Sequence, residues 1–248
     1  MDQDDNTQRT VKKLSEDGYC ILTDVFDTDV VEAKRGLINE IISQQEDGLV
    51  DPFSLRDEYL LPQRDAGIVP DVYKKYPGFR ELAEDERIIE IVERLLGENI
   101  CTNSNYIIYK PSGTDNEVSV HREVDPQYTG SPRYIAWIPL CDVTEENGCL
   151  KAIEGSHTPE EVATWRETST DRGVERYDPE AMSYIEMNAG DVLLFHHHLI
   201  HGSDDVTTAQ PRYAYRVMYQ RPVPSELPDV GCPVMIRRGN VRGVSKDG

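Results

Sequence analysis

The sequence has few cysteines and no long hydrophobic run, and both absences limit what the chain can be. It contains five cysteines and no C-x-x-C pair among Cys20, Cys101, Cys141, Cys149 and Cys232. This odd number indicates reduced thiols rather than a disulfide framework. No stretch approaches the ~18 consecutive apolar residues of a membrane-spanning helix. Residues 1–5 are acidic and polar, unlike a secretory leader, so the sequence predicts a cytoplasmic protein.

Basic residues are also scarce: 26 lysines and arginines stand against 46 aspartates and glutamates, for a net charge of −20. A surface this negative repels phosphate groups, which excludes nucleic acid and anionic membranes as expected partners and leaves a small-molecule substrate. The excess is spread along the chain, and an acid-rich (halophilic) source and a cationic substrate are two hypotheses for it. No pattern in the sequence indicates an oligomeric state.

The 248 residues are predicted to form one domain, because no internal repeat or linker divides them. Amphipathic spacing predicts helices at 9–18, from about 28 onward and at 79–96, with a short strand at 19–22. After Gly97, short apolar runs between turn signals predict strands near 106–109, 134–138, 149–153, 183–187, 192–195 and 213–219. We therefore expect N-terminal helices (about 9–97) on a β core (about 98–222), a C-terminal tail (223–248), and a helix or lid within 157–180.

Histidine is rare, and its placement suggests a metal site. Only six histidines occur, and one lies in the run His121-Arg122-Glu123 at the end of a probable strand. Residues two apart on a strand point to the same side, so His121 and Glu123 can face one point. A distant third ligand would complete a two-histidine, one-carboxylate set, which leaves open positions on iron(II). Alone the H-x-E run is weak, and a solvated surface pair would be its ordinary explanation.

The order of motifs strengthens this interpretation. From about residue 79 to 220 the chain resembles the phytanoyl-CoA dioxygenase family of iron(II)- and 2-oxoglutarate-dependent oxygenases. The blocks that carry the resemblance are Tyr109-Lys110-Pro111, His121-Arg122-Glu123, Trp137-Ile138-Pro139-Leu140, Glu146-Asn147-Gly148-Cys149-Leu150, Gly155-Ser156-His157, Gly190 to Phe195, His201-Gly202-Ser203 and Arg212. The resemblance implies a mainly β fold with flanking helices, built on a double-stranded β-helix (jelly-roll or cupin-like) core.

The resemblance also implies roles for individual residues. His121 and His201 would bind iron, and Arg212 would hold the far carboxylate of 2-oxoglutarate, since a guanidinium pairs well with a carboxylate in a desolvated barrel. Three more residues match positions that line the cosubstrate pocket, namely Ser203, Trp137 and Tyr106. The alternative for Trp137, and more so for Tyr106, is a plain core aromatic.

One departure concerns the carboxylate ligand. The family has H-x-D where this chain has Glu123, whose extra methylene moves the carboxylate roughly 1.3–1.5 Å outward while keeping its charge. Asp125 is the alternative ligand on the same strand face. Arg122 and Arg216 are candidate substrate contacts, and a salt bridge at the rim is the alternative for Arg216.

The run of histidines from His196 to His198 is not expected to bind one metal ion, because consecutive strand residues alternate between faces. His157 is expected to pack in its loop or to support a metal ligand without binding the ion itself. The ligand set that the resemblance implies is therefore His121, His201 and Glu123, with Asp125 as the alternative to Glu123.

The resemblance implies oxidation of a small organic substrate, with O2 and 2-oxoglutarate consumed and succinate and carbon dioxide released. Hydroxylation is the expected outcome, and desaturation, epoxidation or ring closure would use the same residues. One alternative is an oxygenase of acyl-CoA substrates, against which the net charge of −20 counts. Another is a decayed, ligand-binding family member. A cupin-like isomerase, or a dioxygenase that does not use 2-oxoglutarate, would have no need of Arg212.

Overall fold

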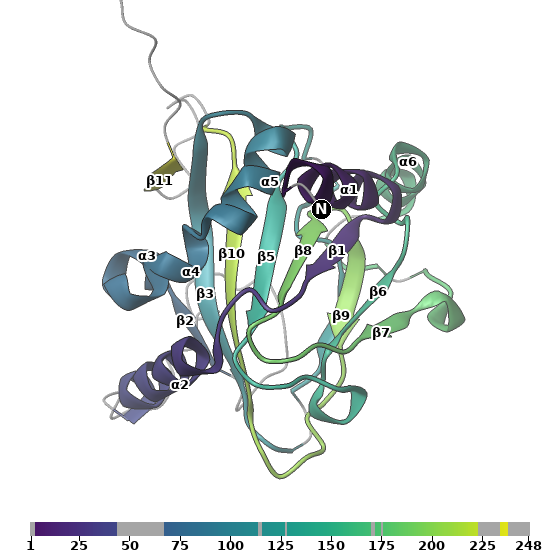
Figure 1. Cartoon of the computed structure of the whole chain (residues 1–248). Coiled ribbons are helices and arrows are strands. Elements are labelled where there is room, and N and C mark those ends of the chain that lie inside the picture. The colour runs from purple at the N-terminus through teal and green to yellow at the C-terminus, as the bar shows by residue number, and fades with distance from the viewer. Residues whose placement is uncertain are drawn as a thin grey trace, which may run out of the picture.

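The computed structural model describes residues 3–43, 67–113, 116–126, 128–169, 172–174, 176–222 and 234–237, and two antiparallel sheets dominate them (Figure 1). The larger sheet has the order β1-β8-β5-β10-β3-β11, with β2 also paired to β3. Its strands are β1 (Tyr19–Leu22), β8 (Val192–His196), β5 (Tyr134–Pro139), β10 (Arg212–Gln220), β3 (Ile100–Lys110), β11 (Val234–Arg237) and β2 (Gly67–Pro70).

The smaller sheet has the order β4-β9-β6-β7. It is built from β4 (Val118–His121), β9 (Ile200–Ser203), β6 (Leu150–Ile153) and β7 (Ser183–Ile185). A hydrophobic cluster between the sheets joins residues of β5, β8 and β10 to residues of β6 and β7. This confirms the predicted double-stranded β-helix with flanking helices.

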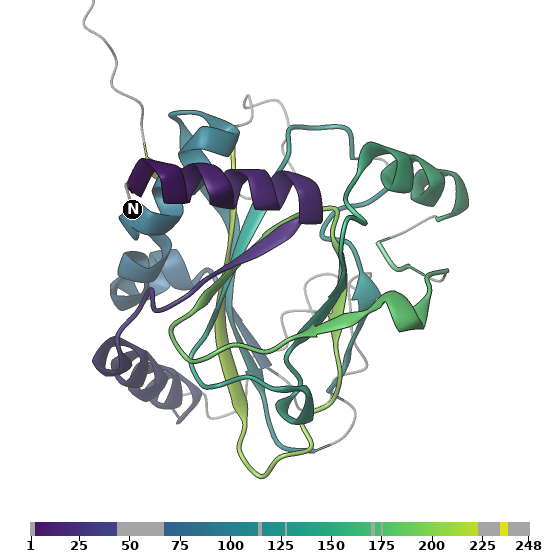
Figure 2. The ribbon, with the colours of Figure 1, turned by 45° about the vertical axis from the view of Figure 1, so that its right-hand side comes forward.

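Helices cover the other face of the larger sheet. They are α1 (Gln3–Asp17), α2 (Thr28–Ser43), α3 (Val72–Lys75), α4 (Arg80–Ala83) and α5 (Glu86–Leu96), while α6 (Pro159–Thr168) lies beside the smaller sheet. Figure 2 shows α1 lying across one end of the strands. Alternation along β5 divides its side chains between two cores, since Ile135 and Trp137 join the inter-sheet cluster while Ala136 and Ile138 join the helix-covered cluster. No described helix is long and apolar enough to span a bilayer.

Two helix predictions need correction. The helix expected at 79–96 is divided, because Asp85 leaves helical geometry and its carboxylate accepts a hydrogen bond from the Arg87 amide, 3.0 Å away, which caps α5. Helix α1 begins at Gln3 rather than near residue 9, and it ends before Gly18 as expected. Residues 44–66, between α2 and β2, lie outside the described residues.

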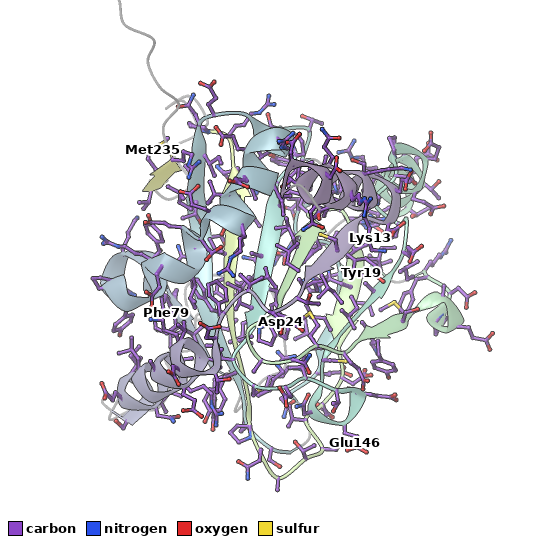
Figure 3. All side chains as sticks on the ribbon, in the orientation of Figure 1. Lys13, Tyr19, Asp24, Phe79, Glu146 and Met235 are labelled. Carbon is purple, nitrogen blue, oxygen red and sulfur yellow. The ribbon has the colours of Figure 1, made fainter. Side chains whose placement is uncertain are left out.

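The segment 223–248 was expected to be a tail, but part of it is structured. Strand β11 pairs with β3 at the edge of the larger sheet, where Figure 3 shows Met235. On the same strand Arg237 forms ion pairs with Glu86 and, at 3.3 Å, with Glu93 of α5. This strand attaches the C-terminal segment to the domain through a contact that no local pattern indicates.

The turn before β8 gives a prediction about stability. Gly190 has a φ of +90°, and a Cβ there would collide with the carbonyl oxygen of Phe26. We therefore expect Gly190→Ala to lower the free energy of unfolding by at least about 2 kcal/mol in urea denaturation. The control is Gly36→Ala on α2, where a Cβ has nothing within 4 Å, and which should be neutral or stabilising by up to about 1 kcal/mol. Equal effects of the two changes would contradict the strain argument.

Candidate active site

Two histidines face each other across the pairing of β4 with β9. His121 is the last residue of β4, and it lies opposite His201 in the register of the two strands. Their ring centroids are 4.4 Å apart. Glu123 completes a buried group in which one ligand atom from each residue lies within 4.8 Å of the others. Among the described residues this is the one cluster of its kind, and Asp125, the alternative ligand, is not part of it.

Hydrogen bonds orient both imidazoles toward a common point. His121 Nδ1 lies 2.8 Å from the carbonyl oxygen of Ser119, and His201 Nδ1 lies 3.0 Å from that of Leu199. A carbonyl can only accept, so each Nδ1 carries a proton, and Nε2 is the ring nitrogen left to bind a metal ion. Burial, with help from His201, lowers the pKa of His121 to about 3, which keeps this ring neutral.

Glu123 reaches the group by a route that differs from the expected one. Strand β4 ends at His121, and Glu123 lies in the bend that follows, where its amide donates to the carbonyl of His197, 2.9 Å away. Strand alternation predicted that His121 and Glu123 face one point. The two side chains do lie together, but the bend after β4 brings them there and not the alternation of a strand. Burial raises the pKa of Glu123, but Arg216 and the two histidines outweigh it and hold the pKa well below its usual value. The side chain is a carboxylate.

Such a set fits a divalent metal ion. Two imidazole nitrogens and one carboxylate oxygen are the donors of the two-histidine, one-carboxylate face that iron(II) oxygenases use. The nearest His–Glu contact, from His201 Nε2 to Glu123 Oε1, is 3.5 Å, a spacing that two ligand atoms of one ion can have.

A second cluster lies at the start of β10. Arg212 is buried, stacks on the Trp137 ring at 5.3 Å and donates to the carbonyl of Gly148. Burial lowers its pKa to about 10, so it stays a cation. Two buried donors, Arg212 Nε and Trp137 Nε1, find no acceptor in the described part of the chain. A bound carboxylate would supply the missing acceptors.

Lys110 belongs to this cluster although we did not single it out from the sequence. It lies opposite Arg212 in the pairing of β3 with β10. Its Nζ donates to Ser203 Oγ at 2.8 Å and to the carbonyl of Asp204 at 2.9 Å. Burial, reinforced by the charge of Arg212, lowers its pKa to about 6. A lysine directly after the apolar run of residues 106–109, and just before Pro111, was the signal available in the sequence.

Three other expected residues lie elsewhere. Tyr106 lies under the guanidinium of Arg216 at 4.7 Å, beside the metal ligands rather than beside Arg212. Arg216 is not at the rim but is buried in an ion pair with Glu123, 2.5 Å from Nη2 to Oε2. Arg122, expected as a substrate contact, is not brought into either cluster. It donates to the carbonyls of Ser156 (2.8 Å) and His198, and stacks on a tryptophan of α6.

The remaining histidines pack against one another. His196, His197 and His198 have ring centroids 4.1–5.6 Å apart, and none of the three belongs to the metal-binding group. The segment after α6 then runs beside the metal ligands, because Gly173 bridges to His121 and the Val174 amide donates to Val120, 3.1 Å away. The insertion at 157–180 thus borders the site.

Comparison with known proteins agrees with this geometry. The ectoine dioxygenase of Sphingopyxis alaskensis is 25% identical over 232 residues, which cover 82% of this chain and 72% of that protein. The peroxisomal phytanoyl-CoA dioxygenase of Mus musculus is 24% identical over 209 residues, or 77% of this chain and 62% of that protein.

Two solved structures share the fold. The epimerase SnoN, in complex with Fe³⁺, alpha ketoglutarate and nogalamycin RO, has a TM-score of 0.70 at 19% identity and covers 94% of this chain and 100% of its own. HygX from Streptomyces hygroscopicus, with nickel, 2-oxoglutarate and hygromycin B bound, has a TM-score of 0.64 at 21% identity and covers 86% of this chain and 87% of its own.

The family model described as phytanoyl-CoA dioxygenase matches residues 14–214. This range includes the whole His–Glu–His group, Lys110 and Arg212, and therefore every residue on which the metal and carboxylate chemistry depends. Iron and 2-oxoglutarate are accordingly the cofactor and cosubstrate. The chain belongs to the phytanoyl-CoA dioxygenase family of oxidoreductases.

Proposed function

We propose that this chain oxidises an unactivated C–H bond of a small organic molecule such as a natural-product intermediate, with hydroxylation as the outcome. The observation that carries the proposal is one barrel in which His121, Glu123 and His201 converge while Arg212 is buried nearby with an unused donor. The first cluster suits a metal ion and the second suits a carboxylate. A keto acid with a second carboxylate can bind the metal ion at its keto acid end and Arg212 through its other carboxylate.

His121 and His201 would hold iron(II) through Nε2, and Glu123 would hold it through a carboxylate oxygen. When bound, iron(II) with 2-oxoglutarate and O2 supplies the oxidising power. The protein's own part is to fix ligand geometry. The carbonyls of Ser119 and Leu199 hold the imidazoles, and the buried environment keeps water away from the reacting groups.

Arg212 and Lys110 would bind the far carboxylate of 2-oxoglutarate, with Ser203 and Trp137 beside them. Arg212 offers a forked pair of donors, and Lys110 holds Ser203 Oγ in place. Trp137 fixes the guanidinium by stacking and has an unused N–H of its own. Tyr106 borders the opposite, metal-binding end of the site.

Two alternatives are less well supported. An acyl-CoA substrate would favour a basic surface for its phosphates, whereas the chain carries a net charge of −20. A decayed, binding-only protein would have no need of three ligands that stay buried and oriented. The free thiols of the four described cysteines support a cytoplasmic location for the enzyme.

The proposed function is tested by succinate release. The iron(II)-loaded protein is incubated with 2-oxoglutarate, O2 and separate panels of natural-product intermediates, amino acids, amines and acyl-CoA esters. We expect slow release without substrate and a large stimulation by a member of the first three panels, with a product 16 mass units heavier. Stimulation by acyl-CoA esters alone would favour that alternative. Cosubstrate binding without any succinate would favour the binding protein.

Lys110 gives a pH-dependent prediction. Its pKa of about 6 leaves it neutral at pH 8, and a carboxylate arriving beside it favours the charged form. Binding of 2-oxoglutarate to nickel-loaded protein should therefore take up about one proton, and the affinity should fall as pH rises above 6, by up to about tenfold per unit.

Calorimetry at pH 8 in buffers of different ionisation enthalpy measures that uptake. Lys110→Met should abolish it, and Lys34→Met should leave it unchanged, because Lys34 is paired with Glu81 on the helical side. Binding of 2-oxoglutarate to the wild type without proton uptake would contradict a neutral Lys110 that becomes charged when the carboxylate arrives.

A further inference from the structure

The carboxylate of Glu123 is held by a contact with another side chain and not by the position of its own backbone. Glu123 lies beyond the end of β4, so the strand does not aim it. A glutamate also has one more rotatable bond than the aspartate of the family pattern, and fixing it costs additional side-chain entropy. Something else must hold the carboxylate in the metal-binding group.

Arg216 makes that contact with both carboxylate oxygens. Its Nη2 lies 2.5 Å from Glu123 Oε2, and its Nε lies 3.2 Å from Oε1. Both side chains are buried. Of the two oxygens, Oε1 is the one that also faces His201 Nε2, at 3.5 Å. The shorter contact of Arg216 is with Oε2, so Oε1 is the oxygen turned toward a metal ligand.

Arg216 is itself held by its neighbours in the larger sheet. It lies in β10 between β3 and β5, opposite Tyr106 and Trp137 in the two registers. Its Nη1 donates to Ser104 Oγ at 3.1 Å, and its guanidinium lies 4.7 Å from the centre of the Tyr106 ring. The carboxylate of Glu123 is thus supported by a rigid part of the larger sheet.

On the strength of the proposed metal site, we propose that Arg216 is a positioning residue: it holds the longer Glu123 side chain so that one oxygen is presented to the metal ion. Partners that orient a ligand in this way typically change metal affinity by about 10–100-fold when they are removed. Arg216 therefore acts through Glu123 and not on the substrate, which reverses our expectation from the sequence.

The test is an anaerobic cobalt(II) titration of the metal-free full chain, followed by the visible absorption of cobalt and by chelator competition. We expect Arg216→Met to weaken cobalt affinity about 10–100-fold, and Arg216→Lys, which keeps a cation without the fork, to fall between the two. In a Glu123→Ala background, Arg216→Met should cause no further loss, because the contact it removes is already gone.

The matched control is Arg237→Met, which removes an arginine paired with Glu86 and Glu93 at the edge strand and should leave cobalt affinity unchanged. Circular dichroism checks that each variant is folded. If Arg216→Met does not fold, the test rests on Arg216→Lys. Unchanged affinity in a folded Arg216 variant, or an equal loss in the Glu123→Ala background, would overturn the proposal. Failure of the wild type to bind cobalt would instead overturn the metal site itself.

Discussion

Replacing His201 by alanine is expected to reduce succinate release at least about 1,000-fold, the largest effect that we predict. The imidazole is one of three converging donors, and its loss removes metal coordination worth several kcal/mol to the transition state. The same change should abolish the visible cobalt spectrum. The buried Nδ1 contact with Leu199 shows that the ring has been oriented for its Nε2 to serve as a ligand.

The control for this variant is His157→Ala. His157 is half-buried beside Gly18 and Ser15 and lies outside the metal-binding group. Its replacement should leave succinate release within about threefold of the wild type, a change of less than 1 kcal/mol. If His201→Ala kept a tenth or more of the wild-type rate, His201 would not be a metal ligand.

Replacing Arg212 by methionine is expected to raise the 2-oxoglutarate concentration needed for half-maximal succinate release about 100–1,000-fold. Removing one partner of a buried, hydrogen-bonded ion pair costs about 3–5 kcal/mol, and the buried Arg212 would be that partner. The predicted change corresponds to about 3–4 kcal/mol, the lower part of this range. Metal affinity should not change, because no ligand is touched. Arg212→Lys should recover part of the loss, since it keeps the charge without the forked donors.

Arg35→Met is the matched control for Arg212. Arg35 lies 5.7 Å from the ring centre of Tyr213, the residue that follows Arg212 and faces the opposite side of β10. Its exposed guanidinium cannot reach the inter-sheet space, so cosubstrate affinity should be unchanged. An Arg212→Met protein that bound 2-oxoglutarate within tenfold of the wild type would contradict the assignment.

The parts of the site that the sequence predicted are those encoded in short runs. His121 and Glu123 are two residues apart, and His201 follows a strand with a clear apolar pattern. Strand periodicity and turn signals also placed most strands of the β core within a few residues. The division of the helix at Asp85 could have been foreseen, because aspartate is a strong N-cap residue.

The contacts of the site that the sequence did not predict depend on how distant strands pair. Lys110 meets Arg212 only because β3 and β10 pair as they do, and Glu123 meets Arg216 from a bend outside any strand. A shift of one residue in that pairing would turn these side chains to the opposite face. No local pattern specifies such a register, and the same holds for β11 against β3.

The central claim is that a metal ion and 2-oxoglutarate bind together in the space between the two sheets. The most direct test of it is an anaerobic absorption titration. The iron(II)-loaded protein is titrated with 2-oxoglutarate in the absence of O2. We predict a visible charge-transfer band that saturates at one equivalent, disappears in His201→Ala and needs far more 2-oxoglutarate in Arg212→Met. A wild-type protein that binds iron(II) but develops no such band at saturating 2-oxoglutarate would contradict the account.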